Sequence, residues 1–330
     1  MFDLQDLEAA ADIVHAAIPP TPQYAWPLLA QRAGCEVWVK HENHTPIGAF
    51  KLRGGLVYLD RLCRERPAVR GLITATRGNH GQSLPYAARG TGVTVTVCVP
   101  QDNSVEKNAA MRALGAELVE YGTDFDAARA HAAALAAARG LEMVPPFHPD
   151  LVRGVATYAL ELFRAVANLH TVYVPIGMGS GICGLIRTRD LLGLGTSIVG
   201  VVADAAPAYA LSVAAGQVVS TETADTIADG MACRIPDQQA LAIIRAGADR
   251  IVRVTDAEIA AAMRTLWTDT HNLTEGAGAA AFAALMSERD ALAGKRVGVI
   301  LSGANVDLTL ALRVLAHDEH RAGGDGRAGG

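Results

Sequence analysis

A lysine placed among apolar and glycine residues is the first feature of this sequence that could do chemistry. Lys51 follows Phe50 at the expected start of a helix and stands just before the glycine pair Gly54-Gly55. A lysine removed from water has a lowered pKa, and its neutral amine is a nucleophile that bonds carbonyl carbons. The alternative is an exposed lysine on an amphipathic helix, because charged side chains are rarely buried without a partner. The loops around Lys51 therefore decide its interpretation.

A glycine-rich loop is the second such feature, and it could bind an anion. Gly177–Gly184 (GMGSGICG) follows an apolar strand expected at Thr171–Val174. Glycines let the backbone wrap an anion, Ser180 adds a hydroxyl, and the start of the following helix favours phosphate. The segment also contains a GxGxxG pattern, and Asp204 ends the next expected strand, about where dinucleotide sites place a ribose-binding acid. Taken alone, the loop leaves a phosphate cradle and a dinucleotide site both open.

Three further segments place polar residues where strands end or helices start. Thr76–His80 (TRGNH) follows a strand expected at Gly71–Ala75, and its helix start offers N–H groups to a carboxylate. Ser302 follows another expected strand, where its hydroxyl could contact a ring nitrogen, and Glu275 starts a helix. Each has an ordinary alternative. The helix dipole alone could favour an acidic residue at the position of Glu275, and a helix-capping role could explain the polar residues of the other two segments. The residues that could be caps are Asn79, Ser302 and Asn305.

The elements that would position these loops alternate regularly along the chain. An amphipathic helix is expected at about 4–17 and a short strand at 36–40. After Lys51, strands alternate with helical patterns of roughly 10–15 residues, which predicts an α/β fold with parallel sheets. The expected strands are 71–75, 93–99, 116–120, 171–174, 197–202, 250–254 and 296–301. Their number suggests two sheets, and sites in open parallel sheets form at the carboxyl ends of strands, where these loops fall.

The composition excludes several classes of function. The chain has 330 residues, half of them hydrophobic, so it can form two domains with real cores. A net charge of −5 without a basic stripe disfavours nucleic acid. The five cysteines are far apart and include no CxxC, which argues against disulfides or zinc and fits a reducing compartment. With no signal peptide and no apolar run near the ~18 residues of a membrane span, we expect a soluble cytoplasmic protein with no membrane partner. Residues 317–330 are expected to form a flexible tail.

Taken together, these segments resemble the threonine/serine dehydratase group of fold-type II pyridoxal-phosphate enzymes, which also includes serine racemase and 3-hydroxyaspartate dehydratases. The resemblance runs from Thr21 to Asp307. The motifs that carry it are Lys40–Glu42, Gly48–Gly54, Gly78–His80, Val174–Gly177, Thr226–Gly230, Glu275–Gly278 and Ser302–Asn305. Their order and spacing favour this interpretation over the dinucleotide one, which gives Lys51, Asn79 and Ser302 no joint purpose.

The resemblance implies a particular fold. It is the α/β fold of the tryptophan synthase β type, with two open parallel-sheet domains and the cofactor in the cleft between them. A large cofactor-binding domain would comprise residues 1–51 and 148–316, and a small mobile domain residues 52–147. Closure of the small domain would exclude water. The resemblance also implies a homodimer.

The resemblance implies roles for individual residues as well. Lys51 would hold pyridoxal 5'-phosphate as a Schiff base and act as the catalytic base, Asn79 would bond the phenolic oxygen, and Ser302 would face the pyridine nitrogen. The cofactor-binding residues it implies are Phe50, Lys51, Asn79, Gly177, Met178, Gly179, Ser180, Gly181, Glu275 and Ser302. The substrate-binding residues it implies are Thr76, Arg77, Gly78, Asn79 and His80.

The predicted reaction follows from these roles. A freed Lys51 is the natural base for the Cα proton of an amino-acid substrate. A neutral Ser302 cannot keep the pyridine nitrogen protonated, which favours expulsion of a β-hydroxyl over transamination. We therefore expect a dehydratase (ammonia-lyase) that converts a β-hydroxy amino acid of the threonine, serine or 3-hydroxyaspartate type to a 2-oxo acid and ammonia. An amino-acid racemase of the serine racemase type is the alternative.

Two departures from the family pattern refine this expectation. Arg77 stands where relatives have Ser or Ala, and an arginine, whose pKa stays above ~12, is a poor acid/base for racemisation. Its guanidinium could instead bind a second carboxylate of the substrate, pair with a nearby acid, or point outward. In the metal site of some relatives, Asp204 matches the first acid, but Ala210 stands where the second is expected. Because hard cations need several oxygen ligands, no metal site is expected.

Overall fold

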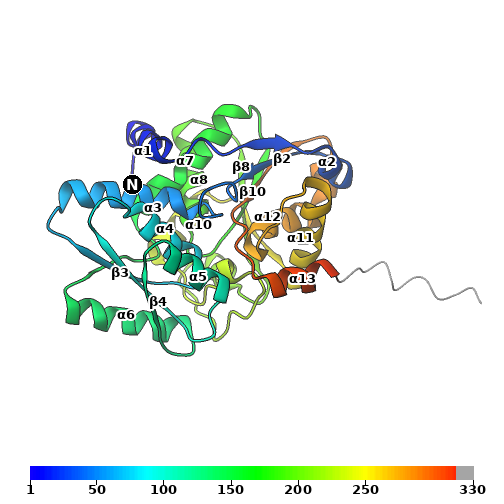
Figure 1. Cartoon of the computed structure of the whole chain (residues 1–330). Helices are drawn as coiled ribbons and strands as arrows, with labels where there is room; N and C mark the ends of the chain where they lie inside the picture. The colour runs from blue at the N-terminus through cyan, green and yellow to red at the C-terminus, as the bar shows by residue number, and fades with distance from the viewer. Residues whose placement is uncertain (317–330) are drawn as a thin grey trace, which may run out of the picture.

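Residues 1–316 are described by a computed structural model, in which helices surround two separate β-sheets (Figure 1). The tail expected at residues 317–330 lies outside these described residues. Within the described part, no helix is both long and apolar enough to cross a membrane.

The larger sheet has six strands. In spatial order they are β1 (Gln23–Ala25), β2 (Glu36–His41), β10 (Arg296–Leu301), β7 (Thr171–Pro175), β8 (Ser197–Ala203) and β9 (Arg250–Val254). Only the edge strand β1 runs antiparallel to its neighbour. The smaller sheet is parallel throughout. Its four strands, in order, are β5 (Glu117–Glu120), β4 (Thr94–Val99), β3 (Gly71–Ala75) and β6 (Glu142–Met143).

Helices connect the strands, as parallel pairing requires. The first seven are α1 (Leu4–Ala17), α2 (Pro27–Ala33), α3 (Lys51–Glu65), α4 (Asn79–Ala87), α5 (Val105–Ala113), α6 (Phe125–Arg139) and α7 (Pro149–Ala165). The remaining α-helices are α8 (Ser180–Leu191), α9 (Ala208–Ala215), α10 (Gln238–Gly247), α11 (Asp256–Thr270), α12 (Gly276–Ser287) and α13 (Leu308–Ala316). Short 3₁₀ turns are η1 (Asp229–Met231) and η2 (Arg289–Leu292). In Figure 1, α6 runs along one side of β3 and β4, which it contacts.

The six-stranded sheet is buried on both faces, as its near-continuous apolar strands lead one to expect. Along β7, Val172 and Val174 pack into one hydrophobic core, while Tyr173 between them packs into another. Helix α12, which is buried along most of its length, covers the Tyr173 face. Helices α7 and α8 cover the opposite face. The strand ends are therefore held between rigid layers.

Helices α3 and α7 cross very closely because glycines stand at their contact. A Cβ atom at Gly154 would lie 2.3 Å from the backbone oxygen of Arg53, and one at Gly54 would lie 2.8 Å from that of Leu151. Either substitution would force the helices apart. Because α3 begins at Lys51, this crossing fixes where the lysine stands relative to α7.

The alternation of strands and helices expected from the sequence is confirmed. The helix at 4–17 and the strands at 71–75, 250–254 and 296–301 have the predicted bounds, and the other predicted strands differ by one residue at one end. The prediction of two sheets is also confirmed. The domain boundaries, with a small domain at residues 52–147, stay a prediction.

Candidate active site

The loops singled out in the sequence converge on one cavity. Its lining includes the segments that follow β3, β7 and β10. Every residue predicted to bind cofactor or substrate lies in its wall. These are Phe50, Lys51, Thr76, Arg77, Gly78, Asn79, His80, Gly177, Met178, Gly179, Ser180, Gly181, Glu275 and Ser302. The structure thus brings the predicted residues together, and their individual roles stay predictions.

Lys51 is the first residue of α3 and lies in the wall of this cavity. Its Nζ donates a hydrogen bond to Ser180 Oγ at 3.1 Å and lies 4.8 Å from the centre of the Phe50 ring. Burial lowers the pKa of Lys51 to about 8, and the charge of Glu275 opposes that shift only in part. A substantial fraction of the amine is therefore neutral near physiological pH. The alternative of an exposed surface lysine is wrong.

The glycine loop after β7 forms a backbone cradle at the start of α8. Gly179 occupies the N-cap position with φ of +94° and offers no side-chain cap, so the first N–H groups of the helix are available to an anion. A Cβ atom at Gly177 would lie 2.2 Å from the oxygen of Gly230, so only glycine lets the loop pass η1 this closely. The expected phosphate cradle therefore has the required backbone.

Two buried tyrosines hold the carbonyl groups of this loop. Tyr158 on α7 donates to the oxygen of Gly181 at 2.9 Å, and Tyr209 on α9 donates to that of Met178 at 3.0 Å. Because these carbonyls are bound from outside the cavity wall, the loop is left with N–H groups to offer a ligand. That arrangement suits a phosphate group.

Asn79 belongs to a chain of hydrogen bonds rather than to a helix cap. Its Nδ2 donates to Glu275 Oε1 at 2.8 Å, and its Oδ1 accepts from Asn305 Nδ2 at 2.8 Å. Asn305 also donates to the oxygen of Ile47 at 2.8 Å. Gly78, not Asn79, occupies the N-cap position of α4. The capping explanations for Asn79 and Asn305 are therefore wrong, and Asn79 keeps one N–H for a ligand.

Glu275 lies between this chain and a second cation that the sequence analysis missed. Lys107 Nζ, on α5, lies 2.5 Å from Asp229 Oδ2 and 3.5 Å from Glu275 Oε2. Burial raises the pKa of Glu275, and the Lys107 ammonium opposes the rise. Burial alone would lower the pKa of Lys107, but the two carboxylates outweigh it and the net shift is upward. Both missed residues, Lys107 and Asp229, line the cavity. The available signals were that Lys107 follows the carboxyl end of β4 and that Asp229 lies in the Thr226–Gly230 motif.

One buried polar atom of the cavity wall, Nε2 of His80, has neither a hydrogen bond nor an ion pair within residues 1–316. Such an atom is uncommon in folded proteins and indicates a missing polar partner. Burial, with a further contribution from the charge of Lys51, lowers the pKa of His80 to about 3, so its imidazole is neutral. A partly neutral amine, a glycine-loop backbone that can hold a phosphate, the free N–H of Asn79 and this unpaired His80 nitrogen form a set that fits pyridoxal phosphate.

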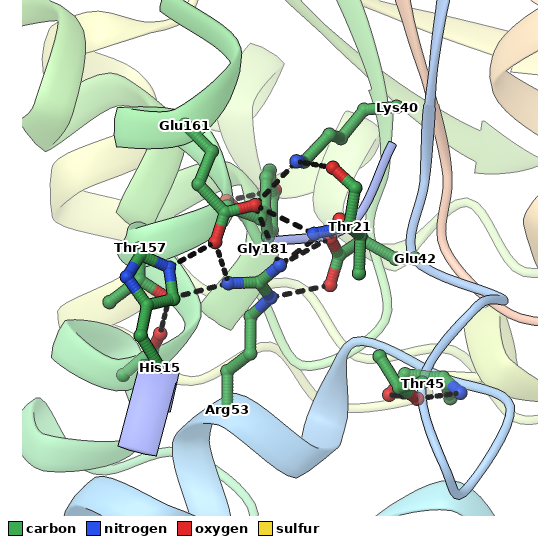
Figure 2. Close-up of polar contacts among 12 residues, drawn as sticks. His15, Thr21, Lys40, Glu42, Thr45, Arg53, Thr157, Glu161 and Gly181 are labelled. Carbon is green, nitrogen blue, oxygen red and sulfur yellow. Dashed lines mark hydrogen bonds and ion pairs between the residues drawn. The ribbon is translucent and has the colours of Figure 1, made fainter. Parts of the chain in front are cut away.

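A buried network of charges surrounds Arg53, which stands two residues after Lys51 on α3 (Figure 2). Arg53, which is fully buried, donates to Glu42 Oε2 at 2.7 Å and to Glu161 Oε1 at 2.6 Å. Lys40 Nζ donates to the other oxygen of Glu161 at 2.5 Å. Burial alone would raise the pKa of Glu161, but the hydrogen bonds and charges of Arg53 and Lys40 lower it to about 2. The network joins β2, α3 and α7, and so fixes the helix that starts at Lys51.

A lysine of lowered pKa beside a glycine loop that follows a parallel strand fits the class of enzymes that use pyridoxal phosphate. The comparison with protein families agrees. The model of the family described as "Pyridoxal-phosphate dependent enzyme" matches residues 14–303. The chain belongs to this family.

Individual relatives cover almost the whole chain. The L-threo-3-hydroxyaspartate ammonia-lyase of Saccharomyces cerevisiae is 32% identical over 304 residues, which are 92% of this chain and 93% of that protein. The structure of the processed form of threonine deaminase isoform 2 from Solanum lycopersicum has a TM-score of 0.86 and 29% identity, covering 96% of this chain and 94% of that one. The serine racemase of Dictyostelium discoideum has a TM-score of 0.84 and 29% identity, with 93% and 99% covered.

These comparisons confirm the fold class and the pyridoxal-phosphate cofactor expected from the sequence. The family assignment replaces the dinucleotide interpretation of the Gly177–Gly184 loop. Asp204, which that interpretation needed for a ribose, forms an ion pair with Arg253 at 2.7 Å.

Proposed function

We propose that this enzyme is a pyridoxal-phosphate dependent dehydratase, or ammonia-lyase, acting on a β-hydroxy amino acid of the threonine, serine or 3-hydroxyaspartate type. Elimination of water gives an enamine, which hydrolyses to a 2-oxo acid and ammonia. One observation carries the proposal: Lys51 Nζ, with its pKa lowered to about 8, lies 3.1 Å from the cradle residue Ser180. The class of reaction agrees with the names of two relatives that are 32% and 29% identical to this chain.

The residues that would hold the cofactor are already arranged for it. The N–H groups of the Gly177–Gly181 loop would bind the phosphate, Asn79 would donate its free N–H to the phenolic oxygen, and Ser302 would offer a neutral hydroxyl to the ring nitrogen. When bound, pyridoxal phosphate supplies an electron-withdrawing ring that stabilises negative charge at the substrate's Cα. The protein's own contribution is binding, orientation and proton transfer.

Lys51 would move the proton. Because the pKa of Lys51 is lowered to about 8, its Nζ can accept the Cα proton near physiological pH. Ser180 Oγ, which accepts a hydrogen bond from Nζ, would hold the free amine in the cavity. The α-carboxylate would bind at the start of α4, where the neutral His80 can donate or accept a hydrogen bond without adding charge. The apolar side chains of Phe125 and Pro146 would keep water from the reacting atoms.

Racemisation is the second candidate, and the presence of Arg77 in the cavity wall argues against it. Racemisation needs a second acid/base on the far face of the substrate, which the family resemblance assigns to the position of Arg77. A guanidinium with a pKa above ~12 neither gives nor takes a proton readily near neutral pH.

The test is to incubate the purified enzyme with L-threonine, L-serine and 3-hydroxyaspartate and measure 2-oxo acid, ammonia and the chirality of the remaining amino acid. Equimolar 2-oxo acid and ammonia support the proposal, and inversion without ammonia overturns it.

The assembly and location of the enzyme are part of the proposal. We propose a homodimer, supported by the large apolar side chains of Tyr24, Leu28 and Trp267, which are 50%, 49% and 42% exposed on or beside the packed helices α2 and α11. Sedimentation velocity tests the homodimer, and a monomer at micromolar concentration would contradict it.

We also propose a cytoplasmic location, which is supported by the five cysteines, all of which are free thiols.

A further inference from the structure

Arg77 is an arginine without a partner in the wall of the active-site cavity. It follows the carboxyl end of β3, next to Thr76 and Gly78, and lines the cavity. Its side chain is exposed, and it forms no hydrogen bond or ion pair with any residue among 1–316. The alternative in which Arg77 pairs with a nearby acid is therefore wrong. Its five N–H donors remain available for a ligand.

The other cations of the cavity wall are already committed. Lys107 is held between Asp229 and Glu275, and Lys51 is the residue that would bond the cofactor. Within the described cavity lining, Arg77 is thus the one cation that can meet an additional anion. A guanidinium is also the side chain best suited to a carboxylate, because two parallel N–H groups match its two oxygens.

Within the described cavity lining, Arg77 is the cation left for a second carboxylate, and much of the rest of the lining is apolar or uncharged. Phe125, Pro146 and Met231 contribute apolar surface, and burial raises the pKa of Cys233 to about 12, so its thiol is uncharged. A carboxylate that bound against such a wall without a cation would lose its hydration without gaining a compensating ion pair. A side chain that ends in a methyl or a hydroxymethyl group needs no such partner. An unpaired arginine in this lining therefore suits a substrate with an acidic side chain.

We propose that Arg77 selects β-hydroxy amino acids that carry a second carboxylate, of the 3-hydroxyaspartate type, over neutral ones such as threonine and serine. This inference rests on the proposed function and names the substrate class of the same site. The α-carboxylate is left to the N–H groups at the start of α4, and the guanidinium of Arg77 binds the side-chain carboxylate beside it. Arg77 is a residue of specificity and takes no part in proton transfer.

The test compares kcat/KM for 3-hydroxyaspartate and for L-threonine in the wild-type holoenzyme and in Arg77→Ala. We expect Arg77→Ala to lower kcat/KM for 3-hydroxyaspartate about 10- to 100-fold, the range of a charge-assisted hydrogen bond, and to change that for L-threonine less than about threefold. Arg77→Lys keeps the charge but not the paired N–H groups of the guanidinium, so its kcat/KM for 3-hydroxyaspartate should lie between those of the wild type and Arg77→Ala. Arg112→Ala is the control. Arg112 is an exposed arginine on α5 that pairs with Glu120 and is not part of the cavity lining, so its removal should leave both values unchanged.

Two outcomes would overturn the inference. Equal losses on both substrates would mean that Arg77 binds the α-carboxylate, and no loss on either would mean that it binds no substrate group. A binding measurement tests the role of Arg77 in substrate selection separately from the proposed elimination reaction. L-aspartate has both carboxylates but no hydroxyl to lose, so its binding to the holoenzyme can be followed by calorimetry against L-2-aminobutyrate. Arg77→Ala should weaken L-aspartate binding about 10- to 100-fold and leave L-2-aminobutyrate unchanged, whether or not elimination occurs.

Discussion

Replacing Glu161 by glutamine tests whether the buried charge network around Arg53 stabilises the fold. The Glu161 side chain is 7% exposed and accepts hydrogen bonds from both Arg53 and Lys40. Its pKa is lowered from 4.5 to about 2, which corresponds to roughly 3 kcal/mol of favourable interaction at 1.36 kcal/mol per unit. The substitution also leaves two buried cations facing one carboxylate, Glu42, and breaking a buried pair costs about 3–5 kcal/mol. We expect Glu161→Gln to lower the free energy of unfolding at pH 7 by about 3–5 kcal/mol.

The pH dependence of this loss has a definite sign. A carboxylate whose pKa is lower in the folded state than in the unfolded one stabilises the fold fully above the unfolded value of 4.5. That stabilisation is lost as the pH falls from 4.5 towards the folded value of about 2. The difference in stability between wild type and Glu161→Gln should therefore be largest above pH 4.5 and shrink below it.

Urea unfolding followed by circular dichroism measures both effects. Glu65→Gln is the matched control, because the Glu65 carboxylate is 54% exposed and pairs with Arg61 one helical turn away. Such surface pairs contribute about 0.5 kcal/mol or less, so the control should unfold almost as the wild type does. A loss below about 1 kcal/mol for Glu161→Gln, or a difference that grows as the pH falls, would refute the reasoning.

Three further predictions concern the cofactor cavity. Because the pKa of Lys51 is about 8, the apoenzyme should bind pyridoxal phosphate covalently at a rate that increases as the pH rises from about 7 to about 9. Visible absorption measures this rate. A rate independent of pH would contradict the lowered pKa of Lys51. Gly177→Ala places a Cβ atom 2.2 Å from the oxygen of Gly230 and should weaken cofactor binding at least about tenfold, measured by fluorescence titration; unchanged affinity would mean that the loop is not the phosphate cradle. Asn305→Ala frees the amide of Asn79 to rotate and should shift the visible band of the bound cofactor and weaken its binding about three- to tenfold, whereas a purely structural role would leave the band in place.

Local sequence patterns predicted most of the fold. The helix at 4–17 has one apolar stripe of helical period, and β3 and β10 are short, mostly apolar runs that begin at a glycine or a charged residue. Parallel pairing followed from the helices between strands, and the topology then brings their carboxyl ends together. That rule placed the loops after β7 and β10 at one edge of the larger sheet. Joining them with Lys51 and with the loop after β3, which belongs to the smaller sheet, rested on the family resemblance.

Contacts between distant segments could not be predicted in the same way. Lys107 and Asp229 are 122 positions apart, and neither stands in a local pattern that indicates an ion pair. Asn79 has the residue type of a cap, but Gly78 takes the cap position and long-range partners bind the Asn79 amide. Arg53 is fully buried although arginines seldom are, because its partners come from β2 and α7. Only the folded chain shows these pairings.

The measurement that tests the account most directly is reduction of the purified holoenzyme with borohydride, followed by peptide mapping. The account predicts a visible absorption band that bleaches on reduction and a pyridoxyl group fixed on Nζ of Lys51. It also predicts that Lys51→Ala gives a folded protein that no longer fixes the group. A cofactor attached to Lys107 or to another lysine, or a protein that stays colourless after addition of pyridoxal phosphate, would contradict the central claim that Lys51 and the loop beside it form the catalytic centre.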